Sequence, residues 1–222
     1  MSRFVSKWLI ILMLALPAVA AAQDDQPVMS RGQGWSVHSG QTVGDRSNVV
    51  FGEVGWPGLS VSLLHGATSR FDIGGRLTLI NYGFEGRIND VLPGMKLQML
   101  TRIGLVETSR FNLGLAFGPG VLFYFPRFGP TIVGIALPLE INAGIPIGSA
   151  IMINFGMDMP MFVTFGRTGS FFIPILFGGG VEYFLNRNLA FTFNLKMGPS
   201  IHTASGHAEF AMEALLGIAY RF

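Results

Sequence analysis

The chain has 222 residues, of which 50% are hydrophobic and only 13% are charged, whereas globular domains average about 25% charged residues. This composition argues against an ordinary soluble fold, and the 30 glycines and 20 phenylalanines favour strands and tight turns over helices. Because the chain has no cysteine, a disulfide scaffold and a thiolate metal site are both excluded.

The first 22 residues have the pattern of a secretory signal peptide. Arg3 and Lys7 supply positive charge, residues 8–19 form an apolar stretch, and Ala20–Ala22 offer small residues for cleavage. The apolar stretch is too short for a membrane-spanning helix. Removing Arg3 and Lys7 from the 15 basic residues leaves as many as the 13 acidic residues, so the mature protein is neutral and no nucleic-acid partner is expected.

Residues 23–46 are polar and glycine-rich, and we expect them to form a loose periplasmic N-terminal arm. From residue 47 onward, alternating apolar and polar positions predict one β-barrel domain, because successive side chains of a strand point to opposite faces. Ten strands fit this pattern, and eight would remain if the first pair lay outside the barrel. The predicted strands are 48–56, 59–66, 70–82, 94–107, 110–125, 129–146, 149–165, 170–185, 188–198 and 207–222.

The last predicted strand, 207–222, shows the clearest alternation. Its first face is apolar throughout and consists of Phe210, Met212, Ala214, Leu216, Ile218, Tyr220 and Phe222. Its second face carries Glu209, Glu213 and Arg221. A tilted strand of about 9–11 residues crosses a bilayer. The pattern therefore predicts a transmembrane strand with lipid on one side and a polar lumen on the other.

The connections between the predicted strands also favour a transmembrane barrel. Those after the second, fourth, sixth and eighth strands are short, and the longest, 83–93, follows the third strand. Short turns on the periplasmic side and longer loops outside are typical of such barrels. A membrane helix over 131–153 is disfavoured because the segment contains Pro138 and Pro146. A soluble barrel would alternate too, but with its apolar face inside.

Charged residues on the predicted lumen face are the candidate functional residues. They are Asp72, Arg76, Lys96, Arg102, Glu140, Asp158, Glu182, Lys196, Glu209, Glu213 and Arg221. Charges in a narrow interior must be paired or hydrated. Two interpretations stay open: a salt-bridged barrel filled by its own side chains, or a narrow water-filled pore whose charges select ions.

Catalytic residues have little support in the sequence. His202 and His207 fall near an outer loop, together with Ser200, Ser205 and Glu209, and could form a nucleophile with a base. Serine and histidine are also ordinary residues of a polar loop. No catalytic residue, metal ligand or cofactor is assigned, and the chain is expected not to be an enzyme.

The signal peptide, the alternating segments and the terminal Tyr220-Arg221-Phe222 resemble the small, porin-like or OmpA-like barrels of Gram-negative outer membranes. The resemblance implies an all-β, antiparallel transmembrane barrel in the cell outer membrane. It also implies that Tyr220 and Phe222 are read by the barrel-assembly machinery, and that the protein contacts outer-membrane lipid, most simply as a monomer. Fold alone does not settle function.

We expect a structural barrel or a narrow pore for ions or small polar solutes. The alternatives are surface binding through the 83–93 loop and a membrane-embedded hydrolase.

Overall fold

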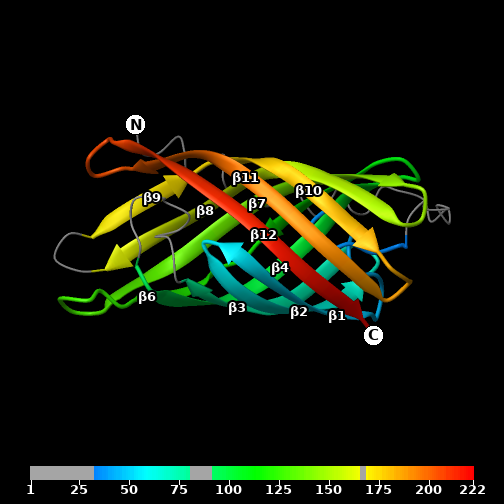
Figure 1. Ribbon diagram of the computed structural model, residues 1–222, viewed down its shortest axis with the longest axis horizontal. Helices are drawn as coiled ribbons and strands as arrows, with labels where there is room; N and C mark the ends of the chain where they lie inside the picture. The colour runs from blue at the N-terminus through cyan, green and yellow to red at the C-terminus, as the bar shows by residue number, and fades with distance from the viewer. Residues whose placement is uncertain (1–32, 81–91, 166–168) are drawn as a thin grey trace, which may run out of the picture.

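A computed structural model describes residues 33–80, 92–165 and 169–222 of the chain. These residues form one antiparallel sheet (Figure 1). Its strands are β1 (Asn48–Trp56), β2 (Gly58–Thr68), β3 (Phe71–Ile80), β4 (Gly94–Glu107), β5 (Asn112–Phe117), β6 (Gly120–Tyr124), β7 (Ile132–Ile147), β8 (Ile151–Phe165), β9 (Ser170–Pro174), β10 (Leu176–Phe184), β11 (Leu189–His202) and β12 (Ala208–Arg221).

Three sequence-based predictions fall wholly or largely outside the described residues. They are the signal peptide over 1–22, the first part of the N-terminal arm over 23–32, and nearly all of the 83–93 loop. Within the described part of the chain, no helix is long and apolar enough to span a membrane.

The sheet closes on itself as a ten-stranded barrel. β1 pairs with β2 on one side and with β12 on the other. Where the first strand meets the last, Asn48 and Phe222 form two backbone hydrogen bonds of 2.9 Å with each other. β5 and β6 together form one barrel strand between β4 and β7, and β9 and β10 together form another between β8 and β11. The predicted antiparallel ten-stranded barrel is confirmed, and the eight-stranded alternative is wrong because the first pair is part of the closure.

Proline explains where the structure departs from the predicted strands. Two predicted strands are broken, one at Gly118–Pro119 and the other at Ile175, directly after Pro174. Proline has no N–H to donate to a neighbouring strand. The predicted end of another strand at residue 198 is also wrong, since β11 continues through Pro199 to His202. That strand persists because the Pro199 carbonyl still accepts a hydrogen bond of 2.8 Å from the Ile175 N–H.

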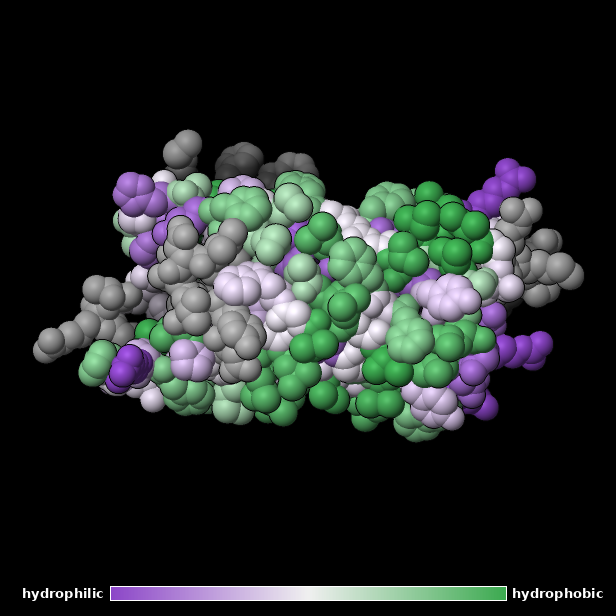
Figure 2. Space-filling view, in the orientation of Figure 1, coloured by the Kyte–Doolittle hydropathy of each residue, from purple (hydrophilic) through white to green (hydrophobic). Residues whose placement is uncertain are grey.

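The outer surface of the barrel wall is apolar, and the polar side chains point inward. On β12, the outward-facing Leu216 and Ile218 are 60% and 48% exposed, whereas Ala219, the residue after Ile218, faces inward and is fully buried. Other large apolar side chains on the outer wall are Val54, Val61, Leu63, Leu77, Leu97, Met99, Val121, Ile135, Phe155, Phe177 and Phe193. Figure 2 shows hydrophobic residues over the wall and hydrophilic residues mainly towards the two ends.

The two ends of the barrel differ. The turns at 69–70, 108–111, 148–150 and 185–188 lie at the same end as Phe222, on the right in Figure 1. We call this the C-terminal end. The opposite end, which carries the turn at Pro57 and the connections after β6 and β11, is called the loop end.

Candidate functional site in the barrel lumen

Residues 33–46, which precede β1, fold into the lumen at the C-terminal end and are called the plug. Trp35 and Val43 are fully buried, and they pack in one apolar cluster with inward residues that include Phe51 and Phe184. The Trp35 ring meets the Phe184 ring edge-on at 5.2 Å. The expectation that this part of the arm is loose is therefore wrong, because its apolar side chains complete the interior of the barrel.

Glu182 on β10 holds the first half of the plug. Its carboxylate accepts hydrogen bonds from the Ser36 hydroxyl at 2.5 Å, the Val37 N–H at 3.1 Å and the His38 N–H at 2.9 Å. Glu182 is fully buried, and a buried carboxylate is costly unless hydrogen bonds satisfy it. The three donors of the plug supply those bonds, which are stronger than neutral ones because the acceptor is charged.

Arg102 on β4 and Asp72 on β3 hold the plug on the opposite wall of the barrel. The Arg102 guanidinium donates to the carbonyls of Ser36 at 3.0 Å, Ser39 at 3.3 Å and Gln41. Asp72 lies 3.7 Å from Arg102 and accepts a hydrogen bond of 3.1 Å from the backbone of the plug at residue 43. The plug is thus anchored on two opposite sides and crosses the lumen between them.

Gly40 is the point at which the plug backbone touches the barrel backbone. A Cβ atom at Gly40 would lie 2.2 Å from the carbonyl carbon of Leu113 and 2.3 Å from the nitrogen of Gly114, both on β5. Only glycine fits such a close approach between two backbones. The plug therefore leaves no gap along this part of the wall.

His38 and Glu53 connect the plug to the centre of the lumen. His38 Nε2 lies 3.2 Å from Glu53 Oε1, and Arg76 lies 3.4 Å from the other oxygen of Glu53, which also accepts a hydrogen bond of 3.1 Å from Ser60. Burial works to lower the pKa of His38, but the Glu53 carboxylate, helped by Glu182, outweighs burial and raises the pKa above its usual value. A protonated His38 is therefore an ion-pair partner of Glu53.

A second charged group lies on β7, β8 and β11. Glu140 and Asp158 are direct cross-strand partners, an arrangement in which like charges repel. The Lys196 ammonium donates to Asp158 at 2.7 Å and to Asn142 at 3.1 Å, and Asn142 donates to Glu140 at 3.0 Å. One cation and one amide thus offset the repulsion between the two carboxylates.

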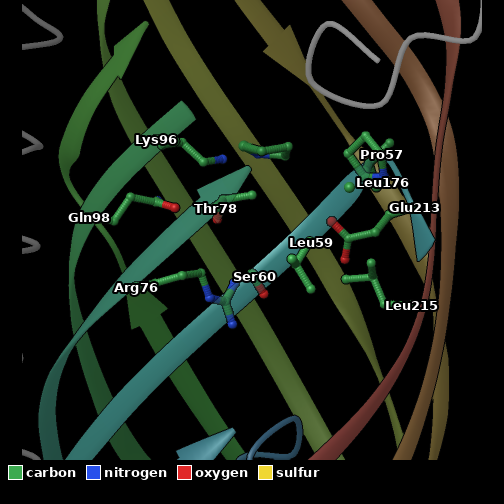
Figure 3. Close-up of a pocket in the computed structure, with 12 residues that line it drawn as sticks. Pro57, Leu59, Ser60, Arg76, Thr78, Lys96, Gln98, Leu176, Glu213 and Leu215 are labelled. Atoms are coloured by element: carbon green, nitrogen blue, oxygen red, sulfur yellow. The ribbon is translucent and has the colours of Figure 1, made fainter. Parts of the chain in front are cut away.

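Small cavities lie between the charged side chains, from the plug to the loop end. One is bounded by Val37 and His38 of the plug, and another reaches Pro57 at the loop end (Figure 3). These two and a third cavity share Arg76 and Glu213 as lining residues, so they are neighbours. The cavity next to the plug has a volume of about 40 Å³, the cavity that reaches Pro57 about 70 Å³ and the third about 60 Å³. One water molecule needs roughly 10–15 Å³. Each cavity has room for a few water molecules.

The eleven charged residues predicted for the lumen fall into three groups. Seven line the cavities: Arg76, Lys96, Arg102, Glu140, Asp158, Lys196 and Glu213. Two more, Asp72 and Glu182, hold the plug, which Arg102 also holds from its place at the cavity wall. The last two lie near opposite ends of β12, where the Arg221 guanidinium is 5.5 Å from the Trp35 ring and Glu209 is the cross-strand partner of Ser200.

Glu53 and His38 belong to the charged lumen cluster but were not predicted from the sequence. Glu53 shares the inward face of β1 with Val49 and Phe51, which are buried under the plug. Because these neighbours are apolar, the sequence pattern did not identify this face as facing a polar lumen. The signal for His38 was the weak alternation of residues 35–39, which places His38 among small polar residues. The significance of both positions depends on the plug being inside the barrel.

The candidate hydrolase residues meet in the turn between β11 and β12. Ser205 Oγ lies 2.8 Å from His202 Nδ1, and the His202 ring stacks on Phe172 with centroids 4.6 Å apart. The His202 N–H also donates to the His207 carbonyl at 2.9 Å. These contacts are those of a stabilised turn, whereas Ser200 is buried at a neighbouring lumen position.

Across the residues that the structure describes, no group of three or more histidine, cysteine, aspartate or glutamate side chains is arranged to hold a metal ion. No protein family matches this sequence, and no curated protein is significantly similar to it.

Proposed function

We propose that this chain is an integral outer-membrane β-barrel of a Gram-negative bacterium, and that its plug closes the lumen to ions at the C-terminal end. In this proposal the first 22 residues are a cleaved signal peptide and the barrel is a non-enzymatic monomer with a hydrated but non-conducting interior.

The distribution of side chains supports a location in the bilayer. Apolar residues such as Leu63, Leu97 and Phe193 are 44–55% exposed on the outer wall, and an apolar surface of this extent makes a soluble protein aggregate. Tyr183 and Tyr220 are 51% and 48% exposed towards the C-terminal end. Tyrosine at this level suits the boundary between hydrocarbon and headgroups.

The plug is the observation that supports a closed lumen. Cavities extend from the inner surface of the plug to the loop end. The plug, held by Glu182 on one wall and Arg102 on the other, is therefore the barrier at the C-terminal end. Releasing the plug is expected to join the cavities to the solvent at both ends. The narrow-pore interpretation then describes the barrel with its plug displaced.

Conductance in a planar bilayer tests this proposal. The refolded mature chain, with its folding checked by a heat-dependent gel shift, is expected to insert and give no discrete current steps. Glu182→Ala removes the acceptor of three plug hydrogen bonds, and an unsatisfied buried donor costs about 1–3 kcal/mol, so current steps are expected. Asp45→Asn, at an exposed position of the same segment, is the matched control and should stay silent. Steps from the native chain that are unchanged in Glu182→Ala would refute the closed lumen.

The two alternative functions have less support. Surface binding through the 83–93 loop concerns residues that lie almost entirely outside the described part of the chain, and it stays a prediction. Lipid hydrolysis is favoured by the contact between Ser205 and His202, but that contact joins residues three apart in one turn. We therefore propose that neither residue is catalytic. The rate of lipid hydrolysis by the native chain and by Ser205→Ala is expected to be the same. A lower rate for Ser205→Ala would show that the serine is catalytic.

A further inference from the structure

Prolines lie at matching positions on neighbouring strands. Pro138 on β7 is the direct partner of Pro160 on β8. On the other side of β8, pairing with β10 ends at Asp158 and Leu176, and pairing with β9 begins at Phe162 and Phe172. Between these two pairs, residues 159–161 of β8 have no paired partner on this side of the strand. The register on both sides places Pro160, the middle residue of the three, opposite Pro174.

Hydrogen-bond directions show what is missing at this point. In an antiparallel strand, the N–H and C=O of one residue face the same neighbour, and the next residue faces the other neighbour. The Ile175 N–H donates to Pro199 on β11 at 2.8 Å, so Pro174 faces β8. Pro138 accepts from Gly118 at 3.2 Å and so faces away from β8.

Pro138 and Pro160 are thus a pair without mutual hydrogen bonds. The backbone nitrogen and carbonyl of Pro160 therefore face the other neighbour, β9, at Pro174. Pro160 and Pro174 thus occupy a position where two backbone hydrogen bonds would normally form, and neither proline has an N–H. We call this interruption between β8 and β9–β10 the seam.

A comparable loss beside Pro138 is offset by a side chain. Pro138 cannot donate to the Gly118 carbonyl, and Gln98 Nε2 donates to that carbonyl instead at 2.7 Å from inside the lumen. At the seam both donors are missing from one pair of positions. The seam is therefore a weak point of the wall, where strands separate at lower cost than along an intact ladder.

The seam separates an apolar outer surface from an amphipathic cavity. Met159, Met161, Ile173 and Ile175 are partly exposed positions that alternate with the inward prolines, and methionine side chains adapt readily to a change in packing. Behind the seam, Pro160 and Leu176 line two of the lumen cavities.

The cavity behind the seam has an apolar side and a polar side. Figure 3 shows Leu176 and Leu215 on one side of it, with Lys96 and Gln98 across from them. Arg76 and Glu213 add charges of both signs to its lining. The polar head of an amphiphile, with the first carbons of its chain against the apolar side, matches this lining.

We propose that the seam at Pro160 and Pro174 is a lateral entrance through which the polar head of a single-chain amphiphile passes from the bilayer into the lumen cavity. Pairing resumes on both sides of Pro160 and Pro174, so the opening is narrow and is expected to hold one hydrocarbon chain behind the head. The tail stays at the outer methionines and isoleucines. This proposal rests on the proposed membrane location and adds a ligand class and a route to it.

Labelling of single cysteines tests the entrance, since the chain has no cysteine of its own. Thr78→Cys places a thiol in the cavity, and Leu77→Cys places one on the outer wall one residue away, where the native side chain is 41% exposed. The probe is N-dodecylmaleimide dissolved in phospholipid vesicles that hold the folded protein. A sulfonated, water-soluble maleimide measures entry through the loop end.

The deciding comparison restores the missing donors. Pro160→Thr with Pro174→Thr supplies two N–H groups, and labelling of Thr78→Cys by the dodecyl probe is expected to slow at least tenfold. The water-soluble probe should label that cysteine equally in both backgrounds, and Leu77→Cys should be unaffected. If the double change prevents folding, as judged by the heat-dependent gel shift, Pro174→Thr alone restores one donor and should slow labelling in the same direction.

Two results would overturn the lateral entrance. Equal labelling of Thr78→Cys with and without the prolines would show that the amphiphile enters at the loop end. Labelling of Leu77→Cys without labelling of Thr78→Cys would show that the seam is closed while the barrel is in the membrane. Failure of the dodecyl probe to label Leu77→Cys would instead refute the membrane location on which both proposals stand.

Discussion

At the scale of single residues, His38 links the plug to the barrel by its charge. Burial, and to a smaller extent Lys196 on β11, lowers the pKa of His38. Glu53 on β1 and Glu182 on β10 favour the protonated ring, and the net effect raises the pKa above 6.5. A group with a raised pKa adds stability that is fully present below its unfolded pKa and is lost as the pH rises through its folded pKa.

The plug should therefore loosen as the pH rises from 6 to 9. Limited proteolysis of the folded barrel in detergent is expected to cleave within 33–46 faster at the higher pH. His38→Gln keeps a polar side chain of similar size without the titration, so its cleavage rate should depend much less on pH over this range. An unchanged pH dependence in His38→Gln would assign the effect to other groups.

Residue-level prediction from the sequence was good where a strand alternates and poor where it does not. Lys196 and Asp158 stand on clear polar faces and meet at 2.7 Å in the lumen. Glu53 was missed because the inward face of β1 is apolar where it covers the plug. Partners such as His38 and Glu53 come from segments that pack only in three dimensions, so strand periodicity carries no information about them.

At the scale of elements, the plug is held in shape by its contact with β5. Gly40→Ala places a methyl group about 2 Å from backbone atoms of Leu113 and Gly114, and overpacking of this kind costs typically about 1–3 kcal/mol. We expect the plug to shift and current steps to appear in a planar bilayer. Gly52→Ala is the control, because its nearest neighbour would be the Ser60 carbonyl at an ordinary 3.8 Å. Silence from a folded Gly40→Ala barrel would contradict a steric seal at this point.

The strands could be predicted from the sequence, and the plug could not. Alternation depends on local chemistry, which is why predicted strands such as 94–107 match β4 at both ends. Pro138, Pro160 and Pro174 were visible in the sequence, but their alignment across β7, β8 and β9 follows from the register of the strands. The plug is polar and rich in glycine, which is also the composition of a loose arm, and its order comes from Glu182, Arg102 and Asp72.

At the scale of the whole molecule, the barrel has apolar residues on its outer wall and charged residues in its lumen, the reverse of a water-soluble barrel. Phe222 and Tyr220 are 60% and 48% exposed on the outside of the strand that closes the barrel onto β1. Such an exterior is stable in lipid and aggregates in water. The proposed closed lumen and the proposed lateral entrance both depend on the proposed location of the barrel in a membrane.

Fractionation of cells that express the full chain tests membrane location most directly. We predict that the mature protein, shortened by 22 residues, is recovered in the outer-membrane fraction and stays there after a sodium carbonate wash. It should also migrate differently on a gel before and after boiling, as a folded barrel does. Recovery of the folded protein in the soluble periplasmic fraction, or its release by carbonate, would contradict the account.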